Sequence, residues 1–126
     1  ELSRKDWDFI RRKQYKQAGF LCEACGGRGK KWPVECHEVW EFNDAAKIQR
    51  LVGLIALCPD CHAVKHMGFA NSRGRGQAAK AHLAKVNGWT IEQTESYVGE
   101  CFDKWEERSN YQWELDLDWL QDNLSS

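Results

Sequence analysis

The stretch Leu57-Cys58-Pro59-Asp60-Cys61-His62-Ala63-Val64-Lys65-His66 decides how this chain of 126 residues folds. Its C-x-x-C unit has a counterpart earlier in the sequence, Cys22-Glu23-Ala24-Cys25. Zinc takes four tetrahedral thiolate or imidazole ligands, and a C-x-x-C unit places two sulfurs on one ion from a single tight turn. The two units together therefore predict one structural Zn²⁺ site, formed by Cys22, Cys25, Cys58 and Cys61.

Two other interpretations of the cysteines fit the sequence less well. No secretory segment accompanies the six cysteines, so metal binding in a reducing compartment is favoured over disulfide bonds. The run from Cys58 to His62 also matches C-x-x-C-H, the attachment pattern of c-type haem. Haem attachment would leave Cys22 and Cys25 without a role, so zinc remains the prediction.

Composition and charge indicate a globular chain of one domain, residues 1–126. Hydrophobic residues make up 42% and charged residues 29%, and no apolar run approaches the roughly 20 residues that cross a bilayer. Residues 1–98 hold 16 Lys and Arg against 11 Asp and Glu, whereas residues 99–126 hold 2 against 8. We expect a basic body that can approach nucleic acid, and an acidic C-terminal region that packs on the domain or meets a protein partner or neighbouring domain.

Periodicity and capping residues predict a mixed α+β order of elements. The expected helices are 3–18, capped by Ser3 and closed by Gly19, then 59–69, 77–87 and 90–108, the last one starting in a capping box at Thr90 and Gln93. His82 is expected on the surface of its helix. The expected strands are 34–40, 51–57 and a short one around 113–117, with a helical turn at 119–124. A polar connection with a helical turn is expected over 41–50, and a mobile basic loop over 71–76.

A second polar cluster surrounds the second C-x-x-C unit. His62 and His66 are four residues apart on the expected helix 59–69, which stacks their imidazoles on one face, where they can grip one ion. His37 lies on the expected strand 34–40 between two acidic residues, Glu35 and Glu38. The sequence H-E-x-x-H is not present, which argues against a metalloprotease.

A knuckle, a strand with a histidine, a second strand and then L-C-x-x-C-H-x-x-K-H opening a helix resemble the HNH (His-Me finger, ββα-metal) endonuclease family over residues 20–70 or so. The resemblance implies a zinc-stabilised ββα-metal core with an N-terminal helix and a helical C-terminal extension over residues 77–126. It further implies a metal-dependent endonuclease, bacterial or phage-encoded and cytoplasmic, that hydrolyses phosphodiester bonds of DNA. Its cofactors would be the structural Zn²⁺ and one catalytic divalent cation, Mn²⁺, Ni²⁺, Zn²⁺ or Mg²⁺.

The resemblance fits the strand in two registers, and both make His37 essential. In the first, Cys36 is the metal ligand and His37 the general base. In the second, His37 binds the catalytic ion together with His62 and His66, and Glu38 stands where the base belongs. The apolar residues on either side of the motif slightly favour the second register. The family also implies that basic residues after the metal ligands contact phosphates, here Lys65, Arg73 and Arg75.

One departure from the family leaves a second function open. The central Asn of the family falls near Gly53, so no Asn is available there to brace the strand. The alternative is therefore a catalytically degenerate zinc module that binds nucleic acid or a protein partner.

Overall fold

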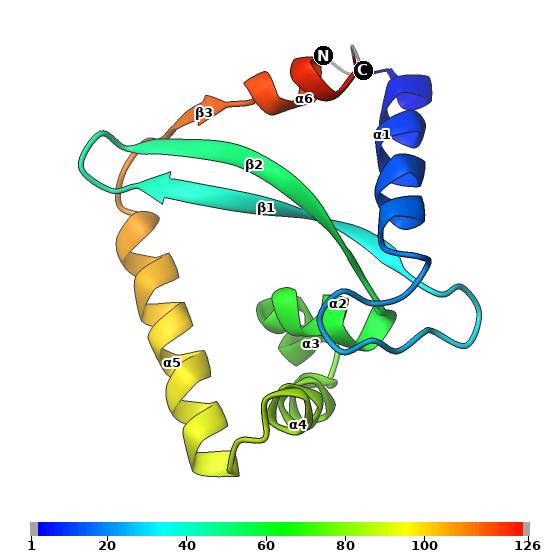
Figure 1. Ribbon diagram of the computed structural model, residues 1–126. Helices are drawn as coiled ribbons and strands as arrows, with labels where there is room; N and C mark the ends of the chain where they lie inside the picture. The colour runs from blue at the N-terminus through cyan, green and yellow to red at the C-terminus, as the bar shows by residue number, and fades with distance from the viewer. Residues whose placement is uncertain (1–2, 125–126) are drawn as a thin grey trace.

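The computed structural model describes residues 3–124 of the chain (Figure 1). The fold is mixed α+β and contains one small sheet of three strands. The elements in chain order are α1 (Arg4–Gln17), β1 (Glu35–Asn43), β2 (Ile48–Leu57), α2 (Pro59–Lys65), α3 (Met67–Ser72), α4 (Gly76–Asn87), α5 (Ile91–Arg108), β3 (Glu114–Asp116) and α6 (Asp118–Leu124).

Helix α1 begins and ends where its sequence predicts. The Ser3 hydroxyl accepts a hydrogen bond from the Asp6 backbone N–H at 3.1 Å, which satisfies one of the free donors in the first turn. Gly19 follows with a φ of +65°, a left-handed conformation that glycine adopts without steric cost. The chain then turns back toward the first C-x-x-C unit.

Strands β1 and β2 form a long antiparallel hairpin, so the expected polar connection with a helical turn over 41–50 is wrong. The strands stay paired from Glu35↔Leu57 to Asn43↔Ile48. The turn is short because the Asn43 side chain accepts a hydrogen bond from the Ala46 N–H at 3.0 Å and Lys47 adopts a φ of +59°. Pairing shifts by one residue between Val39 and Trp40, because Val52 of β2 is left without a partner there, as in a β-bulge.

The third strand, expected around 113–117, is confirmed over Glu114–Asp116 and pairs with β2 in parallel. The strand order β1-β2-β3 places β1 at one edge of the sheet. Arg50 of β2 reaches Asp116 at 2.9 Å, which fixes the added strand to the hairpin. The acidic C-terminal region therefore does pack on the domain, since α6 continues along β2 to α1 (Figure 1).

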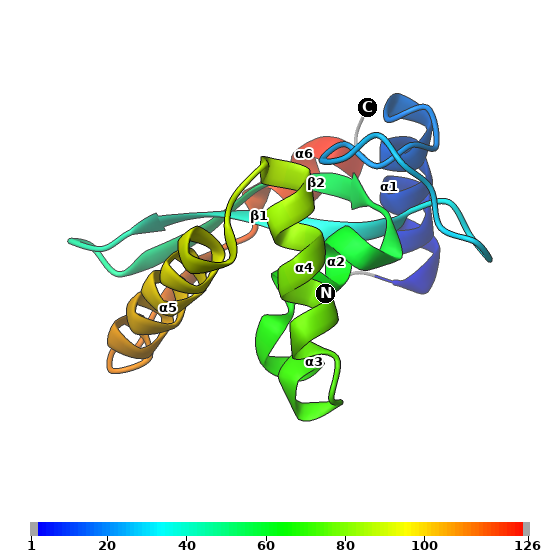
Figure 2. The ribbon, with the colours of Figure 1, turned by 90° about the horizontal axis from the view of Figure 1, so that it is seen from below.

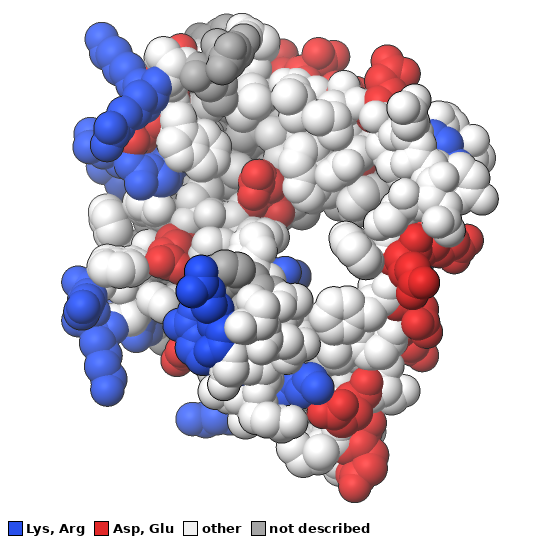
Figure 3. All heavy atoms as spheres, turned by 180° about the vertical axis from the view of Figure 1, so that it is seen from behind, with Lys and Arg blue, Asp and Glu red and all other residues white. Residues whose placement is uncertain are grey.

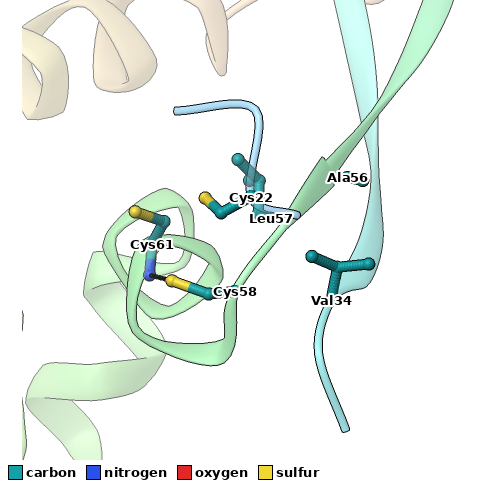
Figure 4. Packing of buried hydrophobic residues seen from close by; sticks show 6 residues of the cluster. All are labelled: Cys22, Val34, Ala56, Leu57, Cys58 and Cys61. Carbon is teal, nitrogen blue, oxygen red and sulfur yellow. Dashed lines mark hydrogen bonds between the residues drawn. The ribbon is translucent and has the colours of Figure 1, made fainter. Parts of the chain in front are cut away.

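The hairpin carries different helices on its two sides. Helix α1 packs on one side near the base of the hairpin, and α2, α3 and α4 lie on the other, as Figures 1 and 2 show from two directions. The core at the base of the hairpin is small. Its buried members are Cys22, Val34, Ala56, Leu57, Cys58 and Cys61 (Figure 4). Three of the six are cysteines of the predicted zinc site. A bound ion would therefore fill part of this core and also cross-link the segments that form it.

The expected helix 59–69 is wrong in one respect, because it is broken at His66. Pro59 opens α2 as predicted, but His66 adopts φ −114° and ψ 48°, which is not helical, and a separate helix α3 starts at Met67. The expected loop 71–76 is shortened to residues 73–75, because Ser72 still belongs to α3 and Gly76 starts α4.

Helices α4 and α5 match the sequence prediction and carry the chain back to the tip of the hairpin. Gly88 ends α4 with a φ of +67°, and the capping box of Thr90 and Gln93 opens α5. At the far end of α5, Arg108 pairs with Asp44 in the hairpin turn at 3.0 Å. Among the helices that the structure describes, none is long and apolar enough to cross a membrane.

Candidate metal centres

The four cysteines of the two C-x-x-C units come together between the first knuckle and the start of α2. One sulfur from each lies within 4.8 Å of the others, and none of them forms a disulfide. Four ligands at about 2.3 Å from a tetrahedral zinc would have sulfurs about 3.8 Å apart. The sulfurs of Cys25 and Cys58 are 3.7 Å apart, so the cluster has the size of a zinc site.

The two knuckles have the same local geometry, although one lies in a loop and the other opens a helix. The Cys25 N–H points at the Cys22 sulfur and the Cys61 N–H at the Cys58 sulfur, both at 3.4 Å (the second contact is dashed in Figure 4). Such donors stabilise thiolates. Burial alone would raise the pKa of Cys22, but N–H groups of Cys25 and Cys58 outweigh it and lower the pKa to about 7.

The other two buried sulfurs lack sufficient compensation, since burial raises the pKa of Cys58 even though the Cys61 N–H points at it. Burial, followed by the neighbouring sulfurs, raises the pKa of Cys61 far above its ordinary value. Four crowded sulfurs can all ionise only beside a cation, and this donor set is the one that zinc prefers. The cluster therefore supports the predicted structural metal site.

Two residues outside the four ligands, Glu23 and His82, connect the cluster to the rest of the fold. Glu23, between the first two cysteines, donates its N–H to the Ala56 carbonyl at 2.9 Å and accepts the Ala56 N–H on its carboxylate. The His82 Nε2 atom lies 3.0 Å from the Cys61 sulfur. The expectation that His82 is a surface residue is therefore wrong. An imidazole at this distance can donate to a metal-bound thiolate, which joins α4 to the metal site.

A second cluster consists of His37 from β1, His62 from α2 and His66 from the break after α2. One ring nitrogen of each lies within 4.8 Å of the others. The ring centroids form a nearly equilateral triangle with sides of 5.2, 5.1 and 4.9 Å. The Nε2 atoms of His62 and His66 are 3.2 Å apart, which suits two nitrogens bound at about 2.1 Å to one tetrahedral or octahedral ion. The break at His66 thus replaces the predicted helical stacking and still brings the rings together.

Glu35 holds one of these imidazoles in place, and sequence reasoning missed it. Its Oε1 atom accepts from His62 Nδ1 at 2.8 Å, and its Oε2 atom accepts from the Trp32 indole at 2.8 Å. With its Nδ1 proton committed to Glu35, neutral His62 presents the lone pair of Nε2 to the cluster. The signal was in the sequence, because Glu35 and His37 are two residues apart on a strand and so share one face.

His37, like His62, is half-buried, whereas His66 is exposed. The His37 Nδ1 atom is buried and has no hydrogen-bond partner among residues 3–124, and a buried polar atom in that state costs about 1–3 kcal/mol. Burial, followed by the charges of His62 and His66, lowers the pKa of His37. His37 is therefore neutral at pH 7 and able to act as a ligand. Three imidazoles are a donor set that suits transition ions such as Zn²⁺ and Ni²⁺.

Neither neighbour of His37 joins the imidazole cluster. Successive side chains of a strand point to opposite faces, so Cys36 and Glu38 lie across the sheet from the three rings. Cys36 instead interacts with Tyr15 of α1, and burial raises its pKa to about 11. Of the two predicted ligand sets, the geometry brings together the three-imidazole set, whereas Cys36 is not within ligand distance of the cluster.

The predicted phosphate-binding residues lie on two segments of the chain. Lys65 ends α2 one residue before His66 and is exposed, and its charge helps to lower the pKa of His37. Arg73 and Arg75 are exposed in the connection between α3 and α4, and their backbone N–H groups both reach the Ala70 carbonyl.

Beside this cluster the structure contains a pocket of about 750 Å³. Its lining includes Lys65 and His66 and, from α5, Tyr97, Phe102 and Trp105. These aromatic side chains explain why α5 stays amphipathic although only Thr94 and Val98 of it are buried.

Comparison of the chain with protein-family models, with curated proteins and with solved structures found no match.

Proposed function

We propose that the protein is a metal-dependent endonuclease that hydrolyses phosphodiester bonds of DNA at the imidazole cluster, with the four cysteines holding a structural zinc ion. The observation that carries the proposal is the convergence of His37, His62 and His66 from three different segments. A cation held there would supply Lewis-acid stabilisation to the scissile phosphate and the leaving oxygen. The assignment agrees with the HNH-like pattern of the sequence.

The residues around the cluster have separate tasks in this proposal. Glu35 keeps the proton on His62 Nδ1 and thereby keeps Nε2 free to bind the cation. Burial keeps His37 unprotonated at neutral pH. Lys65, exposed beside His66, attracts the phosphate that enters the site, and Arg73 and Arg75 bind phosphates farther along the strand.

The residue in the position of the general base is Glu38. Glu38 follows His37 directly, so its side chain leaves the strand on the opposite face, although its charge still reaches His37 and offsets part of the lowering of the His37 pKa. We propose Glu38 as the base of this enzyme only through a water that it polarises at the edge of β1. Loss of cleavage in Glu38→Gln, with metal binding retained, would support this role.

Relaxation of supercoiled plasmid tests the enzyme claim. Zinc-loaded protein is incubated with Mn²⁺, Ni²⁺, Zn²⁺ or Mg²⁺, and the wild type is compared with His37→Ala and with Lys85→Ala, a control at an exposed position of α4 outside both clusters. We expect cleavage by the wild type and by Lys85→Ala, and none by His37→Ala. Three imidazoles favour transition ions over magnesium, so Mg²⁺ should support cleavage poorly. Absence of cleavage with every ion, in folded protein, would refute the proposal.

The alternative is a catalytically degenerate zinc module, and the position of Glu38 is the observation that favours it. In that case the protein would bind DNA or a protein partner without cutting DNA. Gel shifts over a salt series distinguish the two partners, because binding through phosphates weakens steeply as salt rises.

A further inference from the structure

We infer that the outer face of α1 is a second docking surface for the phosphate backbone of duplex DNA, separate from the imidazole cluster. The inference rests on the proposed function in one respect only, the choice of DNA as the polyanion. It extends that function by giving the duplex a second point of contact on the molecule.

The face is defined by the helical repeat. Residues recurring every three to four positions share one side of a helix. One surface groove on α1 is lined by Arg4, Lys5, Asp8, Phe9, Arg12, Lys13 and Lys16. Five of these seven side chains are basic, and they run the whole length of the helix. At 1.5 Å per residue the 14 residues of α1 extend about 21 Å, a length of duplex that carries about 12 phosphate charges.

Four of the five basic side chains of this face are not neutralised by an ion pair among the described residues. Its one acidic residue, Asp8, pairs with Arg11 at the side of the helix. Within residues 3–124, no ion pair is formed by Arg4, Lys5, Arg12 or Lys16, which are all exposed. Arg4 and Lys5 also occupy the first turn, where cations oppose the helix dipole. Their position therefore costs helix stability, and an anionic ligand would offset that cost.

Charge is unevenly distributed over the molecule as a whole. Figure 3 shows Lys and Arg atoms gathered at the edge formed by α1 and the loop that follows it, and Asp and Glu atoms along α5 at the opposite edge. A polyanion would be drawn to the first edge and repelled from the second. The arrangement would also orient a duplex before any specific contact forms.

The location of α1 relates this face to the imidazole cluster. Helix α1 packs against β1 from one side of the hairpin, and α2, which carries His62, packs against β1 from the other. Because β1 is an edge strand, a duplex lying along that edge would touch both surfaces. The basic face thus holds the DNA without contributing to the chemistry.

An anionic membrane is a poorer partner for this face. A helix that lies in a membrane interface needs a broad apolar face of Trp, Phe and Leu residues. On this side of α1 the apolar contribution is Phe9, which is 47% exposed, whereas Ile10 on the inner side is 2% exposed and belongs to the core. The apolar inner side of α1 packs in the core, so the outer face can bind a partner only through its charges.

The test compares two variants that each remove two exposed positive charges. Arg12→Gln/Lys16→Gln changes the proposed face, and Lys85→Gln/Lys104→Gln changes α4 and α5 as a matched control. Glutamine has good helix propensity, and circular dichroism confirms that α1 is retained. Binding to a 20-bp duplex is measured over a range of salt concentrations without added divalent cation, so that cleavage plays no part.

Each phosphate contact contributes about −0.9 to the slope of log K against log salt. We expect Arg12→Gln/Lys16→Gln to make the slope shallower by about 1.8. If the wild type and the variant bind equally when extrapolated to 1 M salt, the variant should bind roughly 60-fold more weakly than the wild type at 0.1 M salt. Arg12→Lys/Lys16→Arg should restore both values, and the control pair should leave the slope nearly unchanged.

Three outcomes would overturn the inference. They are equal slopes for the two charge-removal variants, no binding of duplex by the wild type, and binding of vesicles with 30% anionic lipid in preference to duplex. The proposed function fails independently of this test. If Arg12→Gln/Lys16→Gln has the shallower salt slope and the wild type does not cleave DNA, the enzyme proposal is refuted and the docking surface is retained.

Discussion

Replacing Glu35 by glutamine should weaken metal binding at the imidazole cluster without disturbing the zinc site. Glu35 accepts the Nδ1 proton of His62 and the indole proton of Trp32, both at 2.8 Å. The amide of glutamine removes the negative charge that favours a basic His62 Nε2. Loss of a carboxylate behind a metal-binding histidine typically costs 10- to 100-fold in metal affinity, which is about 1.4–2.8 kcal/mol.

The assay is a titration of zinc-loaded protein with Co²⁺, followed by its visible absorption and by calorimetry. Glu38→Gln is the matched control, because it removes the same charge from the same strand on the opposite face. Trp32→Phe removes one hydrogen bond from Glu35 and should cost about 0.5–1 kcal/mol, a few-fold in affinity.

We therefore expect the order wild type, Trp32→Phe, Glu35→Gln from tightest to weakest, with Glu38→Gln close to the wild type. Equal affinities for Glu35→Gln and Glu38→Gln would refute the reasoning, because the carboxylate behind His62 would then have no effect on the ligand. A loss of structural zinc in Glu35→Gln, measured by elemental analysis, would show that the variant disturbs the fold instead.

Four further perturbations have expected outcomes. Cys58→Ser should lose the zinc ion and unfold, since binding and folding are coupled for structural zinc, whereas Cys101→Ser, at an exposed position outside the cluster, should keep one ion per chain by native mass spectrometry. Thiol labelling of zinc-loaded protein at pH 8 should modify exposed Cys101 rapidly and Cys36 slowly, because the raised pKa of Cys36, about 11, keeps it protonated; equal rates would contradict its burial against α1. The Arg50 guanidinium, followed by the Asp118 N–H, lowers the pKa of Asp116, so the contact of β3 with β2 should hold above the ordinary value of 3.8 and weaken as pH falls through the lowered pKa. Arg50→Gln should therefore raise the pKa of Asp116 toward its ordinary value in a carboxyl NMR titration. Thr90→Ala should destabilise the protein by about 1 kcal/mol in urea unfolding through loss of the capping box of α5, whereas Thr90→Ser should not.

The zinc cluster and the order of the elements could be predicted from sequence because their signals are local. A C-x-x-C unit fixes two sulfurs through its own turn, and Ser3 and Thr90 cap their helices through residues three positions away. The same locality explains why the boundaries of α4 and α5 matched to within a residue or two.

The features that sequence reasoning missed depend on contacts between segments far apart in the chain. The hairpin extends to Asn43 and Ile48 because the two strands pair with each other, which neither segment indicates alone. His82 resembles a surface residue until α4 is placed against Cys61. The break at His66 likewise follows from the packing of α3 against α4, and it changes how the imidazole ring reaches the cluster.

The role of Glu35 was within reach of the sequence. Strand periodicity places it on the face of His37, and a carboxylate on that face is a suitable partner for a metal-binding imidazole. Deciding which of Cys36, His37 and Glu38 can bind the metal ion required the structure, because the answer depends on which face of β1 meets α2.

Anomalous diffraction from a crystal of zinc-loaded protein soaked in Ni²⁺ tests the central claim most directly. Data at the zinc and nickel absorption edges separate the two ions. The account predicts one zinc ion among the sulfurs of Cys22, Cys25, Cys58 and Cys61, and one nickel ion among the rings of His37, His62 and His66. Nickel bound elsewhere, or no second ion in a crystal whose imidazole cluster is open to solvent, would contradict it.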